Sequence, residues 1–186
     1  MSRSWLLIFL SATLLPIACR SPTAATPSVR LRAHPAVIDT GIDWGRTSLE
    51  LTNHTDGSIL AVSIGDGSED GWRTPTIRWR VWNRDGKAVE PGDPPLRCGN
   101  QNGLSWSELA ELAPGESMHF EGWPTYPPQD LLPGKYTAVI EYSHNPEQEW
   151  SGLVGRHEEG AMERLRNSEA FRCATEPFQL IVRQRQ

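Results

Sequence analysis

The stretch that decides the fold is Leu132-Pro-Gly-Lys135 followed by Tyr136-Thr-Ala-Val-Ile-Glu-Tyr142. A Pro-Gly turn leads into a run rich in aromatic and β-branched residues with a period of two, which predicts a half-buried β-strand. Runs of the same kind, bounded by turn residues, recur at 29–34, 48–53, 58–64, 76–82, 87–89, 117–121 and 177–182. Short strands at this spacing predict an all-β fold, an antiparallel β-sandwich.

The run at 76–82 shows the expected two-sided pattern. Ile77, Trp79 and Val81 share one face, and arginines occupy the positions between them. Asn83-Arg-Asp-Gly86 follows directly, and this combination is typical of a β-hairpin turn. We therefore expect a hairpin here with one face in the core.

Two stretches favour short helices in loops. The first is 105–112, where Ser105 can cap the helix and Glu108 follows three residues later. The second is 158–170, with Met162 and Leu165 on one side. The rest of the chain shows no helical periodicity.

The amino terminus reads as an export signal. Arg3 precedes an apolar run that ends at Ala18-Cys19, and this run is too short to span a bilayer. A cysteine after a small residue resembles the lipobox of bacterial lipoproteins, which implies a signal peptide at 1–18, a lipid on Cys19 and a flexible tether at 19–28. An ordinary signal peptide with an incidental cysteine, or an uncleaved anchor, are the alternatives.

The remaining residues, 29–186, have the length of one domain. In the lipoprotein family an aspartate after the cysteine often marks inner-membrane retention, whereas this chain has Arg20. That difference implies an outer-membrane location facing the periplasm.

Charge and cysteine content bear on the possible partners of the protein and on a possible disulfide. The chain has a net charge of −5 and no run of basic residues, which argues against nucleic acid and anionic lipid surfaces as partners. With Cys19 lipidated, Cys98 and Cys173 remain, and a pair in an oxidising compartment favours a disulfide. Two buried free thiols are the alternative.

Tryptophans in Gly-, Pro- and Ser-rich segments are the strongest binding signal, because an indole offers a large rigid surface with one polar group. Arginines and an asparagine accompany them and could complete a planar polar surface. The candidate set is Trp72, Arg73, Arg97, Asn100, Trp106, Trp123 and Trp150. Alternatively, these tryptophans fill the ends of a small sandwich.

A cation site and catalysis have less support. Asp66, Ser68 and Asp70 alternate as in the start of a calcium loop, but the twelfth position is Ile77 rather than glutamate. A solvated acidic turn explains the same residues. No nucleophile, metal-protease or phosphate-loop motif occurs, so we expect no enzyme activity and no cofactor.

Several segments resemble known families. Leu112-Ala-Pro-Gly-Glu-Ser and Leu131-Leu-Pro-Gly-Lys-Tyr resemble the later strands of immunoglobulin-like bacterial domains, which implies Tyr136 at the start of a core strand. Gly71-Trp-Arg-Thr-Pro75, Arg97-Cys-Gly-Asn-Gln-Asn102 and Glu149-Trp-Ser-Gly152 are similar to a group of uncharacterised small proteobacterial lipoproteins. The Pro-Gly-x-Tyr turn also resembles BsuPI-type proteinase inhibitor domains, more loosely.

Three functions are consistent with these features. The first is a membrane-anchored, non-catalytic binding or structural module whose Trp-rich loops contact an envelope protein or glycan. The second is an inhibitor or accessory lipoprotein of an exported hydrolase. The third is a cation-binding domain built on Asp66 and Asp70.

Overall fold

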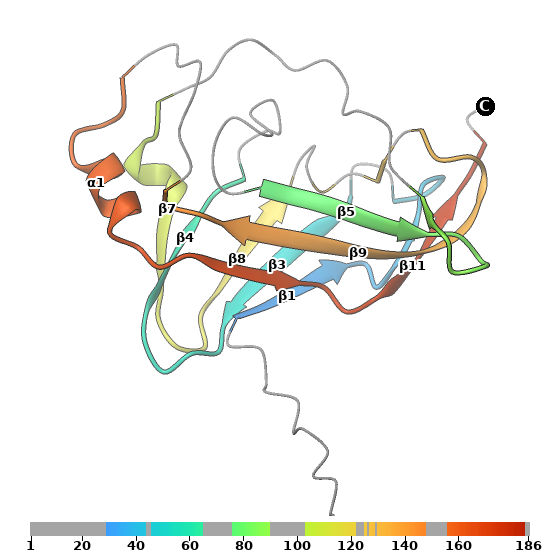
Figure 1. Ribbon diagram of the computed structural model, residues 1–186, viewed down its shortest axis with the longest axis horizontal. Helices are drawn as coiled ribbons and strands as arrows, with labels where there is room; N and C mark the ends of the chain where they lie inside the picture. Colours follow the sequence, from blue (N-terminus) through green and yellow to red (C-terminus); the bar gives the residue numbers. More distant parts are fainter. Residues whose placement is uncertain are drawn as a thin grey trace, which may run out of the picture.

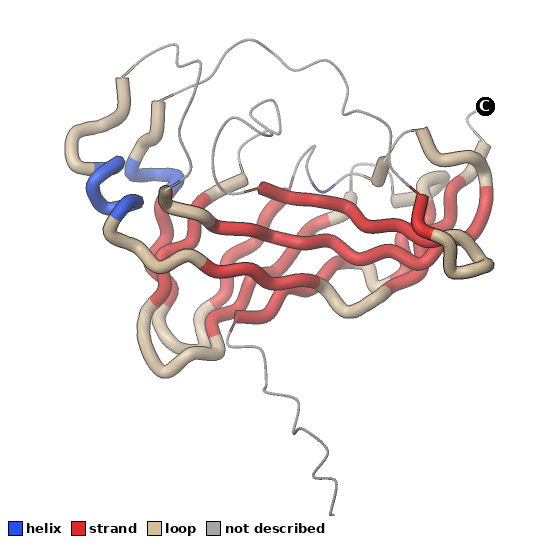
Figure 2. The backbone as a smooth tube through the Cα atoms, in the orientation of Figure 1, coloured by secondary structure: helices blue, strands red, loops and turns tan. Residues whose placement is uncertain are grey.

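β-Strands build most of the described structure, and short helical elements occur in the loops between them (Figures 1 and 2). The computed structural model describes residues 29–43, 46–64, 76–89, 103–121, 125, 127–128, 130–147 and 156–184. In chain order the elements are β1 (Val29–His34), β2 (Val37–Asp39), β3 (Ser48–Asn53), β4 (Ile59–Val62), β5 (Thr76–Trp82), β6 (Ala88–Val89), η1 (Trp106–Glu108), β7 (Leu109–Leu112), β8 (Ser117–Glu121), β9 (Gly134–His144), α1 (Ala161–Arg166), β10 (Phe171–Ala174) and β11 (Phe178–Val182).

Two sheets form the sandwich, with β1, β3 and β8 in one layer and the sheet centred on β9 in the other (Figure 1). The second sheet has the order β2-β11-β9-β5-β6, and β10 also pairs with β9. Apart from the parallel pair β2–β11, the paired strands in both sheets are antiparallel. The fold is therefore the predicted immunoglobulin-like β-sandwich.

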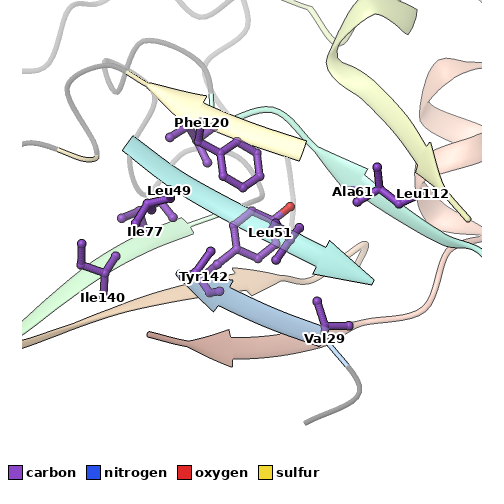
Figure 3. Close-up of a cluster of buried hydrophobic side chains, with 11 residues drawn as sticks. Val29, Leu49, Leu51, Ala61, Ile77, Leu112, Phe120, Ile140 and Tyr142 are labelled. Atoms are coloured by element: carbon purple, nitrogen blue, oxygen red, sulfur yellow. The ribbon is translucent and has the colours of Figure 1, made fainter. Parts of the chain in front are cut away.

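Alternate residues of both sheets meet in the core (Figure 3). Tyr142 lies at its centre and is fully buried, with its ring stacked on Phe120 at 5.3 Å and on Phe171 at 5.6 Å between centroids. Leu49 and Leu51 of β3 cover it from the opposite layer. Burial of side chains this large contributes about 2 kcal/mol each, so this cluster dominates the stability of the sandwich.

Tyr136 begins the core strand in the way that the resemblance implies. Its hydroxyl donates a hydrogen bond of 2.8 Å to the Leu132 carbonyl, four residues upstream. Immunoglobulin-like domains have a tyrosine with this backward bond at the corner before a central strand. The bond fixes the Pro-Gly turn against β9.

The first strand changes layers, and an ion pair secures the change. The chain passes from β1 to β2 at the cis peptide His34–Pro35, and β2 then pairs with β11. The single Nε–H of Arg183 is shared between the two carboxylate oxygens of the buried Asp39, at 3.0 and 3.1 Å, and Nη2 donates to Oδ2 at 2.6 Å. This contact holds the pKa of Asp39 below its usual value.

Two stretches differ from the sequence-based predictions. The segment 109–112, predicted as helix, is the strand β7. It pairs with β4, and this pair continues the two-stranded antiparallel arrangement of β3 and β8. Buried Asn53 makes the bend in this arrangement, since its side chain donates to the carbonyls of Gly57 and Leu112. The helix expected over 158–170 is shorter and spans only α1.

Candidate functional site

Most of the residues predicted for lipidation, a disulfide, binding or a cation site lie outside the described part of the chain. These are Cys19, Asp66, Ser68, Asp70, Trp72, Arg73, Arg97, Cys98, Asn100, Trp123 and Trp150. The expectations attached to them stay predictions. Trp106 is described, and the candidate site is built on it.

Trp106 stands at the end of the sandwich where α1 and η1 meet. It is 49% exposed, which is unusual for tryptophan, yet both of its N–H groups are bonded. The backbone N–H donates to Glu158 Oε2 at 2.6 Å, and indole Nε1 donates to the Glu159 carbonyl at 3.2 Å. The indole is thus fixed in place while half of the residue faces solvent.

Two glycines allow the segments around Trp106 to approach each other. Gly160 adopts φ 77°, and a Cβ there would lie 3.4 Å from the Trp106 ring. At Gly103 a Cβ would lie 2.2 Å from the Arg156 carbonyl oxygen, so only glycine fits. The sequence alone did not show that the two segments are neighbours.

Hydrogen bonds then join these segments. The Leu104 N–H donates to His157 Nδ1 at 3.0 Å, and the Glu158 N–H donates to the Leu104 carbonyl at 2.9 Å. His157 can accept this bond only with Nδ1 unprotonated, and burial together with the charge of Arg166 lowers its pKa accordingly.

A small hydrophobic cluster supports the site from below. Ala161 and Leu165 of α1 pack with Val62 and Leu104, and all four side chains are fully buried. Glu108, predicted as part of a capping box, accepts the Ser105 N–H at 3.0 Å and thereby closes η1. We call the unit formed by residues 103–108 and 156–161 the Trp106 platform.

Replacing Gly103 with alanine is expected to disrupt the Trp106 platform. The added methyl group would overlap a backbone carbonyl that belongs to the neighbouring segment, so one segment must move, at a cost of about 2 kcal/mol. Hydrogen exchange measured by mass spectrometry should show faster exchange in 103–108 and 156–161 and unchanged exchange in β9. Gly57→Ala, where nothing lies within 4 Å of the added Cβ, is the control.

The platform offers a flat aromatic surface beside two carboxylates. Glu158 and Glu159 are both exposed next to Trp106. Such a surface can stack on a sugar ring or hold an apolar side chain of a protein. Trp79, by contrast, packs edge-on against Phe178 at 5.8 Å and belongs to the core, as predicted.

Cys173 lies on the inner side of β10 and packs against the main core cluster. Burial raises the pKa of its thiol to about 12, so it is not a nucleophile at neutral pH. It carries a free thiol in this structure, and Cys98 lies outside the described residues. The structure lends the disulfide between them no support, and the bond stays a prediction.

A serine–histidine pair occurs at the end of β9, but its hydrogen bonds run the wrong way for catalysis. Ser168 Oγ donates to the Leu165 carbonyl at 2.6 Å, so its single hydrogen is already used. His144 Nε2, 2.9 Å away, must therefore donate to Ser168 Oγ and cannot accept its proton. His144 is also buried, which lowers its pKa to about 4.

Within the described ranges, no three His, Cys, Asp or Glu side chains gather as metal ligands, and no helix has the length and apolar character to cross a membrane. Comparisons of the chain with protein families, with curated proteins and with solved structures each return no match.

Proposed function

We propose that this chain is a lipid-anchored protein of the bacterial envelope, like the small proteobacterial lipoproteins that it resembles, and that it acts without catalysis as a binding or structural module for an envelope protein or glycan. The observation that carries the proposal is the exposed but fixed indole of Trp106.

Fixing an exposed aromatic group favours binding. A side chain that is already ordered loses little conformational entropy when a partner covers it, so more of the contact energy appears as affinity. In Trp106 both donors are satisfied within the protein, and 49% of the residue's surface remains exposed to a partner. Removal of a central aromatic residue from an interface typically costs about 2 kcal/mol or more of binding free energy, which is roughly a thirtyfold loss of affinity.

The binding test compares two exposed apolar side chains at different sites. A photoreactive group placed at exposed Ser107 should cross-link an envelope component in living cells, and Trp106→Ala should abolish that product. Leu132→Ala, which truncates a side chain 77% exposed, should leave the product unchanged. Equal cross-linking by all three proteins would contradict the proposed role of Trp106.

The anchor has a separate test. Cys19→Ser should move the protein from the membrane fraction to the soluble periplasmic fraction and abolish labelling with radioactive palmitate, because the thiol is the acylated atom. Ser21→Ala, two residues further on, is the matched control and should remain in the membrane fraction. Retention of the Cys19→Ser protein in membranes would contradict lipid anchoring.

A further inference from the structure

The outer face of the β9 sheet carries a concentration of positive charge that the linear sequence hides. Side chains at alternate positions of β5, β9 and β10 point away from the core, and cross-strand register sets Arg78 and Arg172 on either side of β9, with Lys135 at the other end of that strand. The basic members are exposed: Arg78, Arg80, Lys135 and Arg172. We call this surface the basic face.

Among the described residues, only one of these four side chains has an acidic partner. Arg80 Nε lies 2.9 Å from Glu141 Oε1, in the middle of the face. Arg78, Lys135 and Arg172 pair with no carboxylate of the described residues. Counted over the described residues, the face therefore carries a net charge of +3, from four basic side chains and Glu141, whereas the whole chain has a net charge of −5.

The sheet formed by β1, β3 and β8 does not share this excess of positive charge. Its outward positions carry Arg30 and Arg32 but also Glu50 and Glu121, so its fixed charges cancel. An excess of one sign of charge gives the basic face a positive potential, which attracts an acidic partner.

We infer that the basic face is a docking surface for an extended acidic segment of another protein. Arg78 on β5 and Arg172 on β10 lie one strand to either side of β9, so their strands are about 10 Å apart. An extended segment with carboxylates at alternate positions, about 6.6 Å apart, places one within side-chain reach of each arginine. Guanidinium groups bind such carboxylates in paired hydrogen bonds.

Other features of the face favour a protein over a lipid surface. A twisted sheet cannot lay all four basic side chains on a flat bilayer at once. Glu141, at its centre, would repel lipid phosphates. Thr137 and Gln179 lie between the charged residues and offer hydrogen bonds to a peptide backbone.

The test measures binding of a fluorescein-labelled peptide of alternating glutamate and threonine to the purified full-length protein. We expect binding that weakens as salt rises, because the attraction is between surface charges. Arg78→Glu combined with Arg172→Glu should reduce the affinity at least tenfold. Arg84→Glu combined with Lys87→Glu, the same charge change in the exposed β5–β6 turn, should change it less than threefold.

Two further measurements make the result decisive. The neutral pair Arg78→Gln and Arg172→Gln should lose affinity to an intermediate extent, which separates charge loss from misfolding. Trp106→Ala should bind the peptide normally, so failure of the Trp106 site and failure of the basic face are distinguishable. Absence of salt-dependent peptide binding, equal loss in the control pair, or tighter binding to phosphatidylglycerol vesicles than to the peptide would each overturn the inference.

Discussion

Tyr142→Phe is expected to destabilise the protein by about 3 kcal/mol, although it removes a single oxygen atom. The Tyr142 hydroxyl donates to the Val62 carbonyl at 3.0 Å and accepts the Val62 N–H at 3.1 Å, and all of these groups are buried. Phenylalanine would keep the stacked ring and leave both backbone groups of Val62 without a partner.

The neighbouring strand cannot replace the lost bonds. The Ser63 N–H donates to the Glu108 carbonyl, so positions 63 and 108 form a hydrogen-bonded pair of the β4–β7 ladder. Bonded and non-bonded pairs alternate along an antiparallel ladder, and Val62 therefore directs its N–H and C=O away from β7. Tyr142 is what joins β4, and the Trp106 platform beside it, to β9.

Urea unfolding of Tyr142→Phe and of Tyr136→Phe provides the measurement. Tyr136 also bonds a backbone carbonyl, but at the surface, where water replaces the hydroxyl, and its loss should cost under about 1 kcal/mol. Similar destabilisation by the two variants would contradict the structural role assigned to the buried hydroxyl.

The sequence predicted the strands of the sandwich well because their side chains alternate strictly. The strands over 29–34, 48–53, 76–82 and 117–121 have the predicted bounds. Those that escaped prediction lack such alternation or are too short to show it. β2 has three residues and β10 has four, and their pairing with β11 and β9 depends on contacts distant in sequence.

The sites were harder to predict for the same reason. Trp106 was a candidate from its loop composition, but its partners Glu158 and Glu159 are more than 50 positions away. The basic face depends on register, which places Arg172 of β10 on the same side of the sheet as Arg78 of β5. No short segment of sequence contains either arrangement.

Acidification is expected to weaken the fold through His144, a residue that the sequence did not single out. The ring is buried, packs against Phe171 at 5.4 Å between centroids, and has no partner for Nδ1 among the described residues. Burial disfavours the charged form and lowers the pKa of His144 from 6.5 to about 4.

The sign of the effect follows from the two pKa values. Above pH 6.5 the ring is neutral in both the folded and the unfolded chain, and stability is at its maximum. Between pH 6.5 and 4 the unfolded chain binds a proton that the folded protein excludes, so the free energy of unfolding falls with pH. The full loss is about 3 kcal/mol at pH 4, where the folded protein also becomes protonated.

Urea unfolding of the wild-type protein and of His144→Gln at pH 7 and pH 4.5 measures this contribution. Glutamine can donate to Ser168 Oγ as Nε2 does but does not titrate, so its stability should change far less over this range. His119→Gln, at an exposed position of β8, should retain the wild-type dependence. All three proteins keep the Asp39–Arg183 pair. The stability that this pair contributes is lost only as the pH falls below 3.8, the pKa of Asp39 in the unfolded chain, so this loss is the same in all three proteins. If wild-type protein and His144→Gln lost stability in parallel between pH 7 and 4.5, burial of a neutral His144 would not be the cause.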